Sequence, residues 1–195
     1  MFDIPCVIFA GGRSSRMGED KALLPFGGFD TLTQFQLSRL QKIFKTVYIS
    51  CKSKKKFDFQ ASFIEDVKTQ DTYAPTAGFL AMFEALQSET FFVLSVDAPF
   101  VSENEINKLI EADTQELDAC IAQTAFGIQP MCGIYHRCLH SRFKKMLLED
   151  THKLGFLLKN SNTKYINFKN EEPFLNLNNP KEYEIAKTLI KHKVT

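Results

Sequence analysis

A glycine-rich segment that carries positive charge follows the first apolar run of this 195-residue chain, where residues 11–21 read GGRSSRMGEDK. Glycines such as Gly11 and Gly12 let backbone amides approach a phosphate with no side chain in between, and Arg16 and Lys21 add cationic charge. The segment therefore predicts a loop that binds nucleotide phosphates, in preference to an ordinary surface loop rich in glycine and arginine. It matches neither G-x-x-x-x-G-K-[ST] nor G-x-G-x-x-G, so two common phosphate motifs are excluded.

A single carboxylate ends another apolar run. Asp97 follows the apolar residues 91–95, and Pro99 turns the chain away from it. Ligands bind beyond the carboxyl ends of parallel strands, and Mg²⁺ binds proteins through one or two carboxylates plus substrate phosphates. Capping of the next helix is the alternative role, but Ser102 and Glu105 already form a capping box there. We therefore predict that Asp97 is a metal ligand.

Short apolar runs alternate with amphipathic segments along the chain, which is typical of an α/β fold with a largely parallel sheet. Strands are expected at Val7–Ala10, Val47–Ser50, Phe63–Asp66, Phe91–Ser95, Ala119–Ala122 and Gly133–Tyr135. Apolar residues at helical spacing predict helices around residues 35–44, 79–86 and 106–110, and residues 179–182 carry the start signal of a closing helix. These elements must position the residues that follow each strand.

Length and composition indicate one domain over residues 1–195, with no signal peptide and no membrane span. The formal net charge of +1 gives no large electropositive field, so nucleic-acid binding is not expected. Four lysines that follow the second strand are interpreted as a solvated loop: Lys52, Lys54, Lys55 and Lys56. The five cysteines are odd in number and contain no C-x-x-C pair, which favours a reducing cytoplasm over disulfides or a zinc site.

Residues 9–24 carry a longer pattern, which can be written [LF]-A-G-G-x-S-x-R-M-G-x-D-K-x-L-L. The pattern resembles the signature of the molybdenum cofactor guanylyltransferases. This resemblance implies a three-layer Rossmann-like nucleotidyltransferase domain with a mostly parallel central sheet. It also implies that several residues of the segment bind the nucleotide, namely Phe9, Ala10, Gly11, Gly12 and Lys21.

Further nucleotide-site residues follow from the same resemblance. Asp97 matches the aspartate of the family's D-x-P motif, which holds magnesium and the nucleotide phosphates. Asp66 matches a nucleotide-site aspartate, and a carboxylate can accept two hydrogen bonds from guanine, which cytosine cannot offer. Gly78 ends the sequence APTAG, where the family usually has G-P-x-x-G, and Ser50 stands where asparagine is common. An ordinary surface acid and a strand-end serine remain the alternatives for Asp66 and Ser50.

Residues 174–180 resemble the family's F-x-N-x-N-T-P segment, which implies a pterin contact. Strand-like alternation puts Asn176 and Asn178 on one side of the segment and Leu175 and Leu177 on the other. Amide groups suit a pterin, whose ring edge carries both donors and acceptors. The alternative is that the asparagines are turn and cap residues before the last helix.

The resemblance implies transfer of GMP from GTP to the terminal phosphate of molybdopterin, or of Mo-molybdopterin, with release of pyrophosphate. Arg16, Lys21 and Asp97 are then the catalytic residues, with Mg²⁺ on Asp97. The A-G-G form of the loop, in place of A-A-G, favours GTP. The alternatives are a CTP-dependent molybdopterin cytidylyltransferase, a sugar-phosphate nucleotidyltransferase and a non-catalytic GTP-binding carrier. Molybdopterin-loading proteins and molybdoenzyme chaperones are the expected protein partners.

Overall fold

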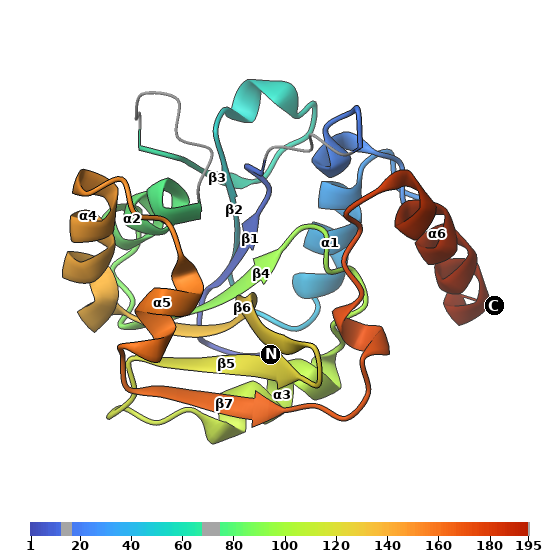
Figure 1. Ribbon diagram of the computed structural model, residues 1–195. Helices are drawn as coiled ribbons and strands as arrows, with labels where there is room; N and C mark the ends of the chain where they lie inside the picture. Colours follow the sequence, from blue (N-terminus) through green and yellow to red (C-terminus); the bar gives the residue numbers. More distant parts are fainter. Residues whose placement is uncertain (13–16, 68–74, 195) are drawn as a thin grey trace.

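The computed structural model describes residues 1–12, 17–67 and 75–194, which are arranged around one seven-stranded sheet (Figure 1). The strands are β1 (Cys6–Phe9), β2 (Val47–Cys51), β3 (Ser62–Glu65), β4 (Thr90–Ser95), β5 (Ala119–Thr124), β6 (Gly127–His136) and β7 (Thr163–Asn167). The α-helices are α1 (Leu32–Leu40), α2 (Pro75–Ala85), α3 (Glu103–Ala112), α4 (His140–Leu148), α5 (Leu154–Lys159) and α6 (Pro180–Val194). Short 3-10 turns are η1 (Lys21–Leu23), η2 (Lys54–Lys56), η3 (Arg137–Leu139) and η4 (Glu172–Phe174).

The sheet has the strand order β3-β2-β1-β4-β6-β5-β7. Strands β3, β2, β1 and β4 are parallel, β6 is antiparallel to both of its neighbours, and β7 is parallel to β5. The expected α/β architecture with a mostly parallel sheet is therefore confirmed. Strand β7 and residues 127–132 of β6 lie outside the expected strands. Polar residues interrupt the apolar pattern in both segments, and Pro130 does so in β6.

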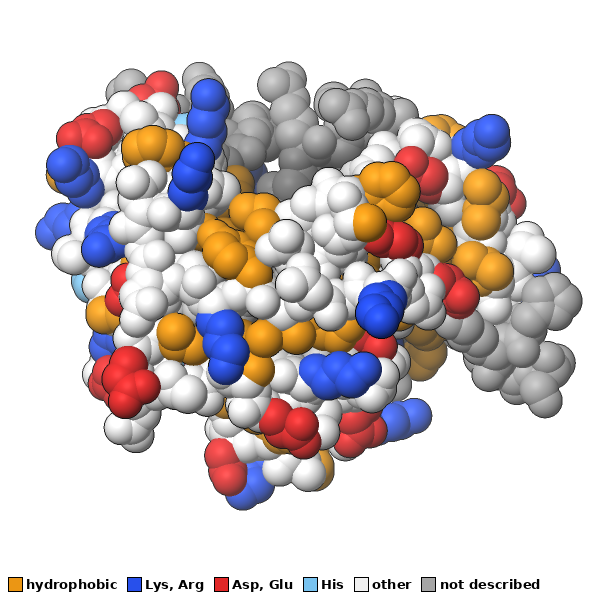
Figure 2. Space-filling view, turned by 60° about the horizontal axis from the view of Figure 1, so that its bottom comes forward, with side chains coloured by type: hydrophobic (Ala, Val, Ile, Leu, Met, Phe, Trp, Pro, Cys, Tyr) orange, Lys and Arg blue, Asp and Glu red, His pale blue; other side chains and the backbone are white. Residues whose placement is uncertain are grey.

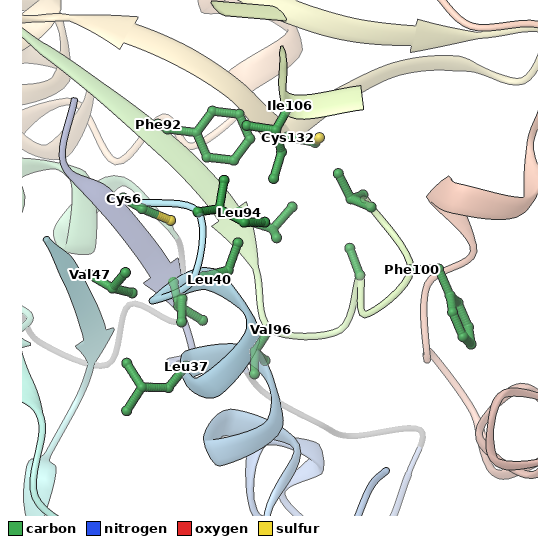
Figure 3. Close-up of a cluster of buried hydrophobic side chains, with 14 of the residues drawn as sticks. Cys6, Leu37, Leu40, Val47, Phe92, Leu94, Val96, Phe100, Ile106 and Cys132 are labelled. Atoms are coloured by element: carbon green, nitrogen blue, oxygen red, sulfur yellow. The ribbon is translucent and has the colours of Figure 1, made fainter. Parts of the chain in front are cut away.

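Alternate residues of β1 divide the core into two layers. Cys6 and Ile8 belong to a buried cluster with residues of α1, α3 and α6, and Phe92 of β4 lies in the same cluster (Figure 3). Val7 and Phe9 belong to a second cluster, to which α2, α4 and α5 contribute. The sheet is thus the middle of three layers, as expected.

The carboxyl ends of β1, β2 and β4 are level with one another. Phe9 is in register with Ser50 on one side and with Ser95 on the other. Beyond the ladder, the Ala10 N–H donates to the Ser50 carbonyl oxygen at 2.8 Å, and the Val96 N–H donates to the Phe9 carbonyl oxygen at 3.0 Å. The segments that leave these three strands therefore begin side by side, where ligands of such sheets bind.

Local capping sets the start of the two helices whose beginnings the sequence predicts. Ser102 and Glu105 form the predicted capping box before α3. At α6, the Asn179 side chain accepts a hydrogen bond from the Glu182 N–H at 3.0 Å, and the Glu182 carboxylate accepts one from the Asn178 N–H at 2.7 Å. These bonds satisfy backbone donors that the first turn of a helix leaves open.

Candidate active site

Lys21 and Asp97 meet at the carboxyl edge of the sheet. Lys21 begins η1, and its amine forms an ion pair with one carboxylate oxygen of Asp97. The two side chains are only 15% and 13% exposed. The Ser95 hydroxyl donates to the other Asp97 oxygen at 2.5 Å. The structure thus brings together two of the three predicted catalytic residues, whereas Arg16 lies outside the described residues.

The backbone on either side of Asp97 is held by residues from distant parts of the chain. Gln36 of α1 is fully buried, and its amide donates to the carbonyl oxygens of Val96 and Ala98, each at 3.1 Å. The Leu177 N–H donates to the Asp97 carbonyl oxygen at 2.9 Å. Gln36 is a residue that the sequence pattern does not point to, since it lies within a helix whose apolar residues give the signal.

Two glycines of the predicted phosphate-binding segment, residues 11–21 (the phosphate loop), meet different structural requirements. A Cβ on Gly11 would lie 3.2 Å from the Asp66 carboxylate, so the backbone passes close to that side chain. Gly18 has a φ of +74°, a conformation that favours glycine. Gly12 is exposed, and a Cβ there would meet nothing within 4 Å. Only Gly11 and Gly18 are therefore required by the shape of the described loop residues.

One lysine of the predicted solvated loop makes hydrogen bonds to other parts of the chain. Lys56 donates from Nζ to the Ala10 carbonyl oxygen at 2.9 Å and to the Asp20 carboxylate at 2.7 Å. Its side chain is 23% exposed, whereas Lys54 and Lys55 are exposed. The prediction is therefore wrong for Lys56. Nothing in the run of lysines distinguishes it from its neighbours, because the difference arises from the turn that η2 makes.

A cavity of about 190 Å³ lies beside the ends of β1 and β2, and Phe9, Ser50, Asp66 and Gly78 contribute to its wall. Ser50 is buried and donates from its hydroxyl to Asp66 at 3.2 Å. A Cβ on Gly78 would lie 2.7 Å from the Ser50 hydroxyl oxygen and 2.9 Å from the Phe9 ring. Burial raises the pKa of Asp66, while the Ser50 hydrogen bond and two nearby lysine charges act in the opposite direction.

A second cavity, of about 200 Å³, lies on the other side of Asp97. Asp97, Phe174, Asn176 and residues 129–132 of β6 line it. The β6 residues escape the sequence prediction, which starts that strand at Gly133. Because β6 is antiparallel to β4, its early residues extend past the end of β4 and reach the cleft.

The two asparagines of the 174–180 segment have different surroundings. Asn176 lines the second cavity, whereas Asn178 is exposed and does not line either of the two cavities. Leu177 is buried and accepts a hydrogen bond at its carbonyl oxygen from the Lys21 amine at 3.3 Å. Leu175 is 42% exposed whereas Leu177 is 1% exposed, so the two leucines do not share one environment as the predicted alternation implies. The cause is η4, which ends just before Leu175 and interrupts the extended alternation.

A third cavity, of about 110 Å³, joins the other two. It shares Phe9, Gly12 and Ser95 with the first cavity, and it shares Ser95 and Asp97 with the second. Lys21 lines this middle cavity. The three cavities therefore adjoin one another and are together called the cleft, with Lys21 and Asp97 in its middle part.

Asp97 is the carboxylate of this cleft that could hold a metal ion together with a bound ligand. In the described ranges, no group of three or more His, Cys, Asp or Glu side chains is gathered in a way that could hold a metal ion. A single carboxylate beside a phosphate loop nevertheless fits Mg²⁺, which takes its remaining oxygens from phosphates and water. Thiol chemistry is disfavoured at Cys51, where burial raises the pKa to about 12.

The surface in Figure 2 carries cationic and anionic side chains interspersed, with apolar side chains between them. This mixture agrees with the formal net charge of +1. Of the helices that the structure describes, none combines the length and the apolar composition that a membrane crossing requires.

Known proteins are similar to this chain in sequence. A family model described as "MobA-like NTP transferase domain" matches residues 6–164. The chain is 40% identical over 189 residues to the molybdenum cofactor guanylyltransferase of Campylobacter jejuni subsp. doylei, covering 97% of this chain and 98% of that protein. It is 32% identical over 194 residues to the molybdenum cofactor guanylyltransferase of Helicobacter pylori, with coverages of 97% and 94%.

Solved structures share the fold at lower sequence identity. Molybdopterin-guanine dinucleotide biosynthesis protein A from Archaeoglobus fulgidus matches with a TM-score of 0.83 and 20% identity, over 97% of this chain and 100% of that chain. The 2-C-methyl-D-erythritol 4-phosphate cytidylyltransferase of Thermus thermophilus matches with a TM-score of 0.73 and 17% identity, over 97% and 100%. The fold alone is thus common to proteins with different substrates. Taken with the family model and the sequence relatives, it shows that the chain belongs to the MobA-like NTP transferase family.

Proposed function

We propose that this protein is a molybdenum cofactor guanylyltransferase, which transfers GMP from GTP to the terminal phosphate of molybdopterin or Mo-molybdopterin. The observation that carries the proposal is the continuous cleft. Asp66 lies in the wall at one end, Asn176 lies at the other, and the Lys21–Asp97 pair lies between them. Relatives with this activity in their name align with almost the whole chain.

In the proposed reaction, an oxygen of the acceptor phosphate attacks the α-phosphorus of GTP. The bond from the α-phosphorus to the oxygen that leads to the β-phosphate breaks, and pyrophosphate leaves with that electron pair. The acceptor oxygen is already anionic, so no general base is needed. The protein then contributes positioning and charge neutralisation. Lys21 and Arg16 are assigned to the phosphate oxygens, and the amides near Gly11 and Gly12 are assigned to seating the nucleotide.

Asp97 is the proposed ligand of Mg²⁺, which supplies Lewis-acid neutralisation of the triphosphate when it is bound. Without a nucleotide, the Asp97 carboxylate is engaged by Lys21 and Ser95. Binding of the charged nucleotide then lets Lys21 exchange its carboxylate partner for phosphate oxygens. The buried pair thus keeps both charges compensated until the substrate arrives.

Base selection is assigned to Asp66. Its carboxylate can accept hydrogen bonds from the N1 and N2 groups of guanine, and Ser50 and Gly78 lie beside it in the same cavity. Phe9 and Ala10 are assigned to the nucleotide as well. At the other end of the cleft, Asn176 and Asn178 are the proposed contacts of the pterin, with Asn176 in the cavity wall and Asn178 beside it in sequence.

We treat residues 1–195 as a single nucleotidyltransferase domain. The five cysteines are all free, four of them buried, which fits the proposed location in the reducing cytoplasm. Molybdopterin-loading proteins and molybdoenzyme chaperones are the proposed partners, because the pterin substrate and the dinucleotide product must both be passed between proteins.

The test is isothermal titration with GTP and with CTP, each with and without Mg²⁺, followed by an assay of pyrophosphate release with molybdopterin. We expect GTP binding that Mg²⁺ strengthens, no binding of CTP, and turnover that requires molybdopterin. A preference for CTP would identify a cytidylyltransferase, and turnover with a sugar phosphate would change the acceptor. GTP binding without turnover would indicate a carrier, and the absence of any nucleotide binding would overturn the proposal.

A further inference from the structure

Lys56 connects the two ends of the phosphate loop. Ala10 directly follows β1, and Asp20 is the N-cap residue of η1. The Lys56 amine donates to the Ala10 carbonyl oxygen at 2.9 Å and to the Asp20 carboxylate at 2.7 Å. One ammonium group therefore holds together two points that are ten residues apart in the sequence, one at each end of the loop.

The Asp20 end of this connection leads directly to the proposed catalytic lysine. The other carboxylate oxygen of Asp20 accepts a hydrogen bond from the Ala22 N–H at 3.1 Å, and the Leu23 N–H donates to the Asp20 carbonyl oxygen at 2.9 Å. These two bonds close the 3-10 turn in which Lys21 lies. A shift of Asp20 would therefore be passed to the backbone that carries Lys21.

The segment that carries Lys56 is itself fixed to the sheet. The Lys54 N–H donates to the Glu65 carboxylate of β3 at 2.9 Å. The ring of Phe57, the next residue after Lys56, stacks on Phe63 of β3 with ring centres 5.3 Å apart. Because η2 is anchored in this way on β3, the backbone that carries Lys56 is held by the sheet independently of its contacts with Ala10 and Asp20.

We infer that Lys56 is a positioning residue: it fixes the separation of Ala10 and Asp20, and through Asp20 it sets where Lys21 stands in the cleft. The inference rests on the proposed function for its effect on nucleotide binding. Its structural part concerns the protein without nucleotide. An ammonium between a carbonyl oxygen and a carboxylate makes charge-assisted bonds, which are stronger than neutral ones.

The experiment compares Lys56→Met with Lys55→Met, which removes an exposed lysine from the same turn. The first measurement is amide hydrogen exchange of Ala10, Ala22 and Leu23 without nucleotide. We expect faster exchange of these amides in Lys56→Met, wild-type exchange in Lys55→Met, and a nearly unchanged thermal midpoint in both. The second measurement is Mg²⁺-GTP affinity, which we expect to fall about tenfold in Lys56→Met alone, the loss typical of one charge-assisted hydrogen bond.

Asp20→Asn removes the same ion pair from its other side and keeps a side-chain oxygen for the cap. If Lys56 acts through Asp20, the double variant should bind GTP no more weakly than the weaker of the single variants. The inference would be overturned if the loss of GTP affinity in the double variant equalled the product of the losses in the two single variants. Wild-type amide exchange in the Lys56→Met protein would overturn it as well. A wild-type protein that binds no GTP would overturn the proposed function instead, and the exchange comparison would still decide the role of Lys56.

Discussion

The two ends of the cleft are constructed differently. The nucleotide end lies on the parallel strands β1, β2 and β3, and its shape depends on backbone that passes close to side chains, as at Gly11 and Gly78. The acceptor end is made by the antiparallel strand β6 and by the segment before α6. That segment is joined to the centre by the hydrogen bonds that Leu177 makes with Asp97 and Lys21.

This difference indicates how each end should respond to change. A close backbone approach leaves no room for added atoms, so the nucleotide end should respond to extra volume. The acceptor end presents side chains such as Asn176 from the segment before α6. Removing one of these side chains should therefore remove one contact and leave the others in place. The predictions below test this contrast, beginning with Asp97 at the centre of the cleft.

Asp97→Asn should have the largest effect, because Asp97 lines the middle and the acceptor-side cavities, pairs with Lys21, and is the proposed metal ligand. The substitution keeps the shape of the side chain and removes its charge. We expect kcat for pyrophosphate release to fall about a thousandfold, comparable to the loss of a major electrostatic contact in a transition state. The thermal midpoint should remain within a few degrees of the wild type. Near-normal turnover would show that the assignment of the centre is wrong.

Gly78→Ala should have the next largest effect and should act on the nucleotide end alone. Its new methyl group would lie 2.7 Å from the Ser50 hydroxyl oxygen and 3.2 Å from the Asp66 carboxylate. We expect GTP affinity, measured by titration, to fall at least about tenfold, as overpacking of a tight site costs 1–3 kcal/mol.

The matched control for this prediction is Gly155→Ala in α5, where the added methyl group would make an ordinary contact of 3.6 Å with Ile128. It should leave GTP affinity unchanged. Equal losses in the two variants would show that the effect comes from general destabilisation and not from the volume of the base cavity.

Asn176→Ala should separate the two ends, because it changes only the acceptor cavity. We expect KM for molybdopterin to rise about fivefold, the cost of one lost hydrogen bond, with GTP affinity unchanged. Asn178→Ala is the comparison, and its smaller expected effect follows from its exposed position outside the cavity wall. A loss of GTP affinity in Asn176→Ala would contradict the separation of the ends.

Ser50→Ala should have the smallest effect at neutral pH, about threefold in GTP affinity, and a clearer effect on the pH profile. Burial raises the pKa of Asp66, so this carboxylate, the proposed partner of guanine, takes up a proton at a higher pH than an exposed aspartate would. GTP binding should therefore weaken as the pH falls through that pKa. Removing the Ser50 hydrogen bond, which favours the charged form, should move this loss to higher pH. An unshifted profile of affinity against pH would argue against Ser50 as a partner of Asp66.

The contrast between the two ends also explains what could be predicted from the sequence. At the nucleotide end, the strands are continuous apolar runs whose ends can be located in the sequence, and the family resemblance implies nucleotide contacts at Gly11, Ser50, Asp66 and Gly78. The structure places all four around one cavity. Apolar periodicity is a local signal, and it is sufficient to predict the strands of the parallel half of the sheet.

The other contacts depend on positions that no local pattern reports. Residues 129–132 contain a proline and reach the cleft only because β6 is antiparallel to β4. Gln36 and Lys56 are polar residues whose partners lie on other elements of the fold. The predicted alternation at residues 174–178 also fails at Leu175, which follows η4 and is exposed, whereas Leu177 is buried. Tertiary contacts of this kind override local preference.

The hydrogen bond from Lys21 to Leu177 has a consequence for the order of events during synthesis. The two residues are 156 positions apart, so the ribosome has already made β1 to β7 when Leu177 is added. The backbone of Asp97 therefore gains this partner only near the end of synthesis, when most of the chain has been made. Because domains generally fold as units, the arrangement of Lys21 and Asp97 seen here should be complete only after this last segment has joined the fold.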